Sequence, residues 1–81
     1  MNTDEQLNLT TPITTVSDLL YAHFDANVTP ESTVAILVIG TRGIERNIVE
    51  LALHQEKIRW RNGRNKKPEI WLRKVIDLYI S

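Results

Sequence analysis

The amino-acid sequence predicts an α+β fold: three helices, two short strands that form a basic β-hairpin, and a C-terminal helix. Three observations support this order. Helix start and stop signals recur between residues 14 and 54. Residues 57–61 alternate charged and apolar side chains, and the Asn62-Gly63 pair that follows is a strong hairpin marker. The last residues of the chain return to apolar side chains at helical spacing.

Length and composition predict one small domain. The chain has 81 residues, of which 42% are hydrophobic, and this is enough for a single core of modest size. Residues 1–12 are polar and lack periodicity, so they are predicted to form a flexible arm, with residues 13–81 as the domain.

The first two helices are predicted from their ends. Residues 15–18, Thr-Val-Ser-Asp, resemble a capping box, and apolar side chains then recur at helical spacing up to Asn27, which can end a helix. The second helix has Thr29 as its N-cap, Pro30 at its first position and Gly40 as a stop. Its body, residues 34–39, is rich in β-branched side chains and also fits a buried strand, but the end signals are more specific than propensity and favour a helix.

The third helix and the hairpin are predicted from a change of period. Residues 57–61 and 69–72 have the pattern of two paired strands around a turn over residues 62–68. Residues 42–54 have the period of a helix, whose apolar stripe consists of Ile44, Ile48, Leu51 and Ala52.

The C-terminal segment is more apolar than a solvent-facing helix requires. It either closes the core or pairs with a second copy of the chain to form a homodimer. In the second case the dimer interface consists of Val75, Ile76, Tyr79 and Ile80.

Charge is distributed unevenly along the chain. The formal net charge is zero, but residues 1–40 contain five acids and no Lys or Arg, whereas residues 41–81 contain ten Lys or Arg and five acids. The two parts therefore carry net charges of −5 and +5. Such asymmetry is typical of a domain with one basic face that contacts nucleic acid or a membrane surface. The densest group of basic residues, called the basic cluster below, consists of Lys57, Arg59, Arg61, Arg64, Lys66 and Lys67.

The order of elements leads to a family resemblance. Residues 34–60 (VAILVIGTRGIERNIVELALHQEKIRW) combine a small residue in the second helix, Ala35, with a short turn around Gly40-Thr41, a third helix and a strand that follows directly. This order resembles the winged helix-turn-helix superfamily, and among its small members the short regulators of fimbrial operons. Their wing also ends in an aromatic-rich strand, comparable to residues 68–72.

The resemblance implies a small transcriptional regulator that binds double-stranded DNA in a sequence-specific way. Helix 42–54 would enter the major groove, and hairpin 57–72, the wing, would lie on the phosphate backbone. The basic cluster would then bind phosphates, which position a protein without reading sequence. Base edges would be read by Thr41, Arg42, Arg46 and Asn47, because Arg pairs well with guanine and Asn with adenine.

Three alternatives remain open. Residues 40–43, Gly-Thr-Arg-Gly, resemble the G-x-x-G loop of K-homology domains, which bind single-stranded nucleic acid. A protein-interaction module, such as an inhibitor or antirepressor, could use the same winged-helix scaffold, and Glu45 and Glu50 on the third helix leave room for a protein partner. The basic cluster also fits a solvated hairpin whose charges protect a strand edge.

The sequence predicts neither an enzyme nor a cofactor. It contains no cysteine, and its two histidines, His23 and His54, lie far from each other and from any carboxylate pair, so no metal site is expected. Residues 40–43 lack the lysine and the length of a phosphate-binding P-loop. The longest apolar run, residues 34–39, is far too short to cross a bilayer, and no signal peptide is recognisable. A cytoplasmic protein without a membrane segment is therefore expected.

Overall fold

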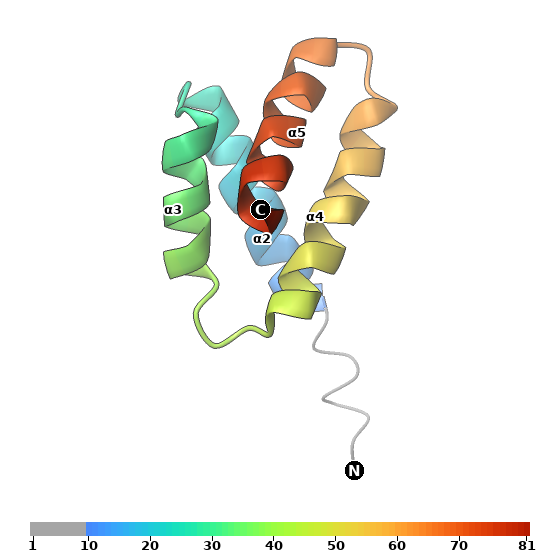
Figure 1. The fold of residues 1–81 in the computed structure, drawn as a ribbon. Helices are drawn as coiled ribbons and strands as arrows, with labels where there is room; N and C mark the ends of the chain where they lie inside the picture. The colour runs from blue at the N-terminus through green and yellow to red at the C-terminus, as the bar shows by residue number, and fades with distance from the viewer. Residues whose placement is uncertain (1–9) are drawn as a thin grey trace.

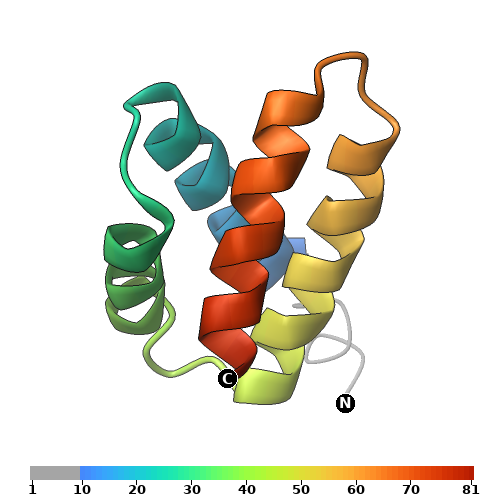
Figure 2. The same cartoon turned by 45° about the horizontal axis from the view of Figure 1, so that its top comes forward.

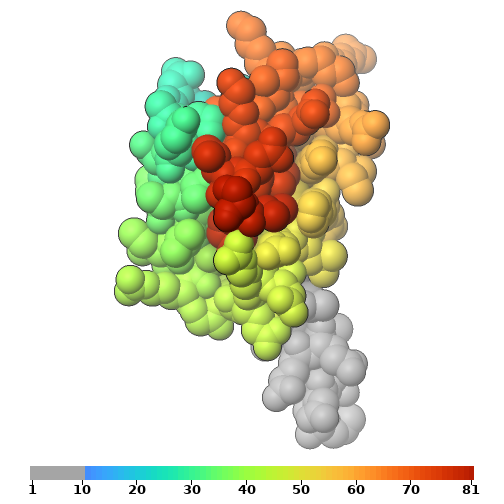
Figure 3. Space-filling model, viewed as in Figure 1, coloured from blue at the N-terminus to red at the C-terminus, as the bar shows by residue number. Residues whose placement is uncertain are grey.

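The computed structural model describes residues 10–81, which form four α-helices. α5 lies between α3 and α4, and α2 lies behind it (Figures 1 and 2). α2 packs mainly on α4, and α3 packs mainly on α5, which also contacts α4. The space-filling view shows the surface of α5 flanked by α3 on one side and α4 on the other (Figure 3). The helices are α2 (Thr10–Asp25), α3 (Pro30–Gly40), α4 (Arg46–Arg61) and α5 (Lys66–Ile80).

The predicted α+β fold class is wrong. No strand occurs within residues 10–81, and both segments predicted as strands are helical: residues 57–61 end α4, and residues 69–72 belong to α5. The predicted third helix, residues 42–54, begins four residues later and continues to Arg61. The wing is therefore absent from the described chain. The sheet that a K-homology domain requires is absent from it as well.

The alternation in residues 57–61 fits a helix because Ile58 is not a core residue. Its side chain is 59% exposed, whereas Trp60 is only 4% exposed. A five-residue alternation is too short to exclude a helical period, and residues 10–81 supply no strand that could pair with it. The buried positions of α4 follow one face of a helix, with spacings of three, one, three and four residues at Val49, Ala52, Leu53, Glu56 and Trp60.

α2 begins earlier than predicted and ends where predicted. Residues 10–12, assigned to the flexible arm, form the first turn of α2, and residues 1–9 of that arm lie outside the described residues. At the other end Asn27 adopts a left-handed conformation with φ of 58°. The Val28 N–H donates to the His23 carbonyl at 2.9 Å and the Asn27 N–H to the Phe24 carbonyl at 3.0 Å. These two bonds form a Schellman motif, which terminates the helix.

Side-chain caps begin α3 and α5. The Thr29 hydroxyl accepts a hydrogen bond from the Ser32 N–H at 3.2 Å, and Pro30 occupies the first turn, as the sequence predicts. Asn65 caps α5 in the same way, since its Oδ1 accepts from the Lys67 N–H at 3.1 Å. The predicted turn over residues 62–68 therefore shortens to residues 62–65, and the helix starts before the segment that was predicted as a strand.

The core lies between the four helices and holds one aromatic cluster. The Trp60 and Trp71 rings stack with their centroids 6.0 Å apart and an interplanar angle of 13°, and Phe24 meets both rings edge-on. The indole N–H of Trp71 donates to the Val28 carbonyl at 2.8 Å, which ties α5 to the connection between α2 and α3. The buried apolar residues are Val16, Leu20, Leu37, Val49, Ala52, Leu53, Trp60, Leu72, Val75 and Ile76.

Candidate nucleic-acid interface

The basic cluster stays together although the hairpin does not exist. Three of its members lie on the last two turns of α4, one lies in the turn, and two lie in the first turn of α5. A turn of residues 62–65 between two antiparallel helices brings these positions to one end of the molecule, where α4 meets α5 (Figure 1). All of them are exposed except Lys57, which is half-buried.

A charged groove lies on this face between α4 and α5. Its volume is about 250 Å³, and it is lined by Lys57 and Arg61 from α4 and by Glu69 and Arg73 from α5. Within each helix the two residues are four positions apart, so they lie on the same side of that helix. Three cations and one carboxylate line the groove, which therefore favours an anion.

The cations of the charged groove have no carboxylate partner in the described chain. Within residues 10–81 the ion pairs are Arg46–Glu50 and Arg59–Glu56, and neither involves a residue of the groove. A second groove shares Arg73 with the first and is also lined by Ile70, Lys74 and Asp77, so it adds one cation and one carboxylate to this face. Sequence reasoning did not assign Arg73 or Lys74 to the interface. The helical spacing from Glu69 to Arg73 is the signal that would have included the first of them.

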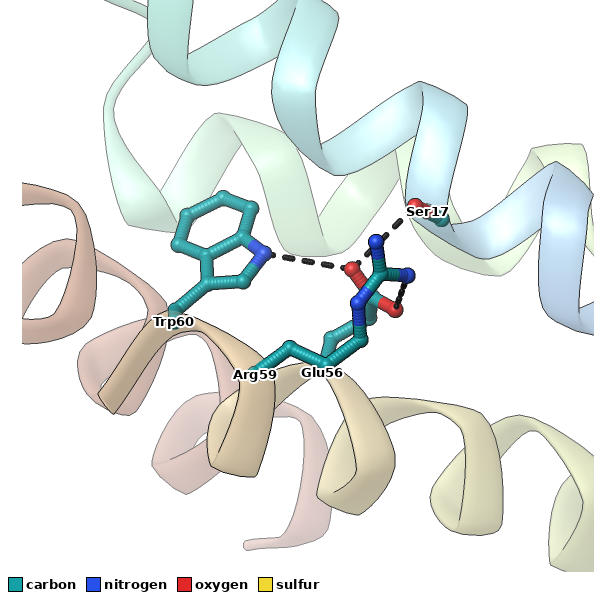
Figure 4. A network of polar contacts seen from close by, with 4 residues as sticks. All are labelled: Ser17, Glu56, Arg59 and Trp60. Atoms are coloured by element: carbon teal, nitrogen blue, oxygen red, sulfur yellow. Dashed lines mark hydrogen bonds and ion pairs between the residues drawn. The ribbon is translucent and has the colours of Figure 1, made fainter. Parts of the chain in front are cut away.

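A buried carboxylate holds one member of the basic cluster in place. Glu56 is fully buried, and its Oε1 accepts hydrogen bonds from the Ser17 hydroxyl and from the Trp60 indole N–H, both at 3.1 Å (Figure 4). Its Oε2 accepts from Arg59 Nη1 at 2.9 Å. The Arg59 side chain is 58% exposed, so its guanidinium is anchored at one edge and open to solvent elsewhere.

Sequence reasoning missed this network. Ser17 is one of the four residues that resemble a capping box, but the structure buries it in the middle of α2, where its hydroxyl bonds to Glu56 of α4. The available signal is the spacing of Glu56 from Leu53 and Trp60, because positions three and four residues apart share a helix face. A carboxylate on the apolar face of a helix needs hydrogen-bond donors, and Ser17 and Trp60 supply two of them.

The four residues predicted to read bases do not form one group of side chains that are free to contact DNA. Thr41 is 5% exposed, and its hydroxyl donates to the Leu37 carbonyl at 2.7 Å. Arg46 donates to Glu50 at 3.1 Å and to the Tyr79 carbonyl at 3.0 Å, and its guanidinium lies 5.2 Å from the centre of the Tyr79 ring. Both side chains therefore have structural partners.

The other two predicted base-reading residues, Arg42 and Asn47, are exposed near the start of α4. The charged groove lies near the end of that helix. Since a helix rises about 1.5 Å per residue, Arg46 and Arg61 are separated by about 22 Å along its axis. α3 and α4 also lie on opposite sides of α5 (Figure 1), so they do not form the packed helix pair of a helix-turn-helix.

The C-terminal residues predicted as a dimer interface are divided by the structure. Val75 and Ile76 are core residues with 0% and 4% exposure, so they close the core and present no outer surface. Tyr79 is partly buried, and Ile80 is 44% exposed. Pairing with a second copy stays a prediction, and on this surface it can involve only the last two residues of the four.

The described residues contain no group of three or more side chains suited to a metal ion. His23, which the sequence places on the apolar side of the first helix, has its Nδ1 atom 2.7 Å from the Leu19 carbonyl, so the ring already has a partner within α2. None of the helices in residues 10–81 has the length and the apolar character needed to cross a bilayer.

Comparison of the chain with protein-family models, with curated proteins and with solved structures gave no match. The winged helix-turn-helix resemblance therefore has no independent support, and the wing on which it depended is absent from residues 10–81.

Proposed function

We propose that this chain binds the phosphate backbone of a nucleic acid, with the charged groove as the main contact. The observation that carries the proposal is the convergence of Lys57, Arg61 and Arg73 on one groove, with no carboxylate paired to them in residues 10–81. Unpaired cations that face each other repel, so their proximity is favourable when an anion lies between them. The basic cluster and Lys74 extend the same face.

The distribution of charge along the chain supports the choice of this face. The basic cluster belongs to the end of α4, the start of α5 and the turn between them, whereas the exposed acids Asp18, Asp25 and Glu31 belong to α2 and α3. A polyanion is therefore attracted to the α4–α5 face. The predicted duplex-binding transcriptional regulator remains compatible with this proposal, since backbone contacts serve duplexes and single strands alike. Because Thr41 and Arg46 have structural partners within the protein, recognition of a specific base sequence has less support than binding of the phosphate backbone.

The experiment is a salt titration of binding with three labelled probes: duplex DNA, single-stranded DNA and single-stranded RNA. Three phosphate contacts predict a slope of log Kd against log salt of about 2.7 for the duplex, at about 0.9 per contact. Arg61→Gln and Arg73→Gln should each lower that slope by about 0.9. Both side chains are exposed, so these substitutions should leave the fold intact.

Arg42→Gln is the matched control. It removes the same charge from an exposed side chain at the opposite end of α4, farther from the charged groove than the Debye length of about 8 Å at physiological salt. The slope of log Kd against log salt for Arg42→Gln should equal that of the unmodified chain. The proposal is wrong if the chain binds none of the three probes at low salt, or if Arg42→Gln and Arg61→Gln weaken binding equally.

A second candidate function is a protein-interaction module, which one observation favours. α3 carries three exposed branched apolar side chains, Ile36, Val38 and Ile39, with exposures of 39%, 54% and 61%. A helix that is apolar on all sides is normally covered. Ile39→Lys should then abolish a self-association or a partner complex detected by sedimentation while leaving nucleic-acid affinity unchanged. If the unmodified chain sediments as a monomer, self-association through this surface is excluded and only a different partner could cover it.

A further inference from the structure

A pocket lined by aromatic and basic side chains lies on the side of α4 facing α2. Its volume is about 250 Å³, and it is formed where α2, the end of α4 and the start of α5 meet. We call it the aromatic pocket. Ligand pockets for drug-sized molecules measure about 300–1,000 Å³, so a space of this size suits one flat ring with a small substituent. The residues that matter for its chemistry are Tyr21, Trp60, Arg59, Arg64 and Asn65.

The aromatic wall of the pocket packs against the core. Tyr21 is 41% exposed, and its ring centroid lies 4.6 Å from that of Trp60 at an interplanar angle of 35°. Trp60 is in turn stacked on Trp71 and held by its hydrogen bond to Glu56. The exposed tyrosine therefore ends a row of three packed rings, and its position is set by buried neighbours.

The polar wall of the pocket favours an anion. Arg59 donates to Glu56 through its Nη1 atom. A guanidinium has five N–H donors, so the remaining N–H groups of Arg59 can donate to a ligand. Arg64 has no carboxylate partner within residues 10–81. Asn65 uses its Oδ1 to cap α5, and within residues 10–81 its amide N–H donors have no partner. As the N-cap of α5 it also places the positive end of the helix dipole at the pocket.

An exposed ring beside two arginines and a helix N-terminus matches the two parts of a nucleotide. We infer that the aromatic pocket binds one unstacked nucleotide, whose base stacks on Tyr21 and whose phosphate contacts Arg59 and Arg64. A base inside a duplex has both faces covered by its neighbours, so this pocket selects single-stranded nucleic acid. The inference rests on the proposed function, because the charged groove on the other side of the same helix end binds the adjoining backbone.

The experiment compares single-stranded and duplex probes in variants of Tyr21. The single-stranded probes are labelled oligothymidylate and oligouridylate, and the third probe is a mixed-sequence duplex of equal length. Tyr21→Leu keeps apolar packing against Trp60 but removes the ring, and Tyr21→Phe keeps the ring and is the matched control. Circular dichroism and thermal unfolding establish that each variant is folded.

Tyr21→Leu should weaken single-strand binding by about 5- to 150-fold, the equivalent of about 1–3 kcal/mol per stacked base at 1.4 kcal/mol per tenfold. Duplex affinity should not change, and Tyr21→Phe should bind both kinds of probe as the unmodified chain does. Arg64→Gln should weaken single-strand binding. An NMR titration with a nucleoside monophosphate should shift the signals of Tyr21 and Asn65, whereas inorganic phosphate should shift those of Asn65 alone, because it has no ring.

Two results overturn the inference. One is Tyr21→Leu binding single strands as tightly as Tyr21→Phe does, and the other is an equal loss on single strands and duplex. If Arg61→Gln still lowers the salt slope in either case, the proposed backbone binding stands and only the aromatic pocket is refuted. If the unmodified chain binds no probe, both are refuted. Binding of the free monophosphate with no binding of oligonucleotides would refute the single-strand assignment and identify a mononucleotide site.

Discussion

Replacing the buried carboxylate of Glu56 by leucine tests the polar network that joins α2 to the end of α4. Glu56→Leu removes the acceptor of two buried donors, the Ser17 hydroxyl and the Trp60 indole N–H. Each buried donor left without a partner costs about 1–3 kcal/mol, so two cost about 2–6 kcal/mol. Leucine regains part of this by burying methyl groups, and we expect a net loss of about 2–4 kcal/mol.

The ion pair with Arg59 adds little to that figure, because Glu56→Leu removes the buried charge and leaves Arg59, whose side chain is 58% exposed, in solvent. Arg59→Gln is the opposite case, since it leaves the fully buried Glu56 carboxylate without its cation. It should therefore cost more than the loss of a pair exposed on both sides, which is worth about 0–1 kcal/mol. A domain of this length is stable by about 4–12 kcal/mol, at about 0.05–0.15 kcal/mol per residue. The loss expected for Glu56→Leu is thus a large fraction of the total.

The assay is urea unfolding followed by far-ultraviolet circular dichroism. A loss of about 2–4 kcal/mol should lower the urea midpoint by about 1 M or more with an unchanged m value. Gln55→Leu, an exposed position on the same helix, is the matched control and should stay within about 0.5 kcal/mol of the unmodified chain.

A double-mutant cycle separates the network from the general effect of a core substitution. Ser17→Ala should destabilise the unmodified chain by about 1 kcal/mol, but it should be neutral or stabilising when Glu56 is already leucine, because the orphaned hydroxyl is then removed. The reasoning is refuted if Glu56→Leu is as stable as the unmodified chain, or if the effect of Ser17→Ala is the same in both backgrounds.

Three further predictions concern the fold. Asn27→Ala should destabilise the chain by about 1–2 kcal/mol because alanine disfavours the left-handed conformation, whereas Asn27→Gly should melt close to the unmodified chain; equal melting of the two variants would contradict the assigned cap. Trp71→Phe should cost at least about 0.5–1.5 kcal/mol in urea unfolding, since it removes the donor to the Val28 carbonyl; no change in the midpoint would argue against that bond. Deleting residues 75–81 removes two core residues and should abolish the helical circular dichroism signal at 25 °C; a cooperatively folded truncated chain would show that the tail does not close the core.

The basic cluster shows how a surface can be predicted for the wrong structural reason. Its six residues lie within eleven positions of the sequence, and both a hairpin and a turn between antiparallel helices bring such positions together. Their gathering at one end was therefore expected under either fold. The members that tertiary structure adds, Arg73 and Lys74, follow only when residues 66–80 are recognised as one helix.

The prediction of base-reading residues depended on the orientation of their side chains, which the sequence does not specify. Thr41 and Arg46 are polar residues near a turn, and nothing local distinguishes a free side chain from one that bonds to another helix. The Tyr79 carbonyl that accepts from Arg46 is 33 residues away in the chain. Tyr21 differs from these residues because the sequence analysis did not select it. A tyrosine on a helix is not a recognisable site residue until the fold places Trp60 and two arginines beside it.

The sequence by itself determined the C-terminal end of α2, both ends of α3 and the separation of charge along the chain. Thr29, Pro30 and Asn27 act through hydrogen bonds and dihedral angles within a few residues, so their effect can be predicted without knowing the fold. Only the tertiary structure decided whether residues 57–61 and 69–72 are strand or helix. Short apolar patterns fit both periods, and the choice depends on the neighbour that buries them: here Trp60 and Leu72 pack in a helical core, and within residues 10–81 no strand exists to pair with either segment.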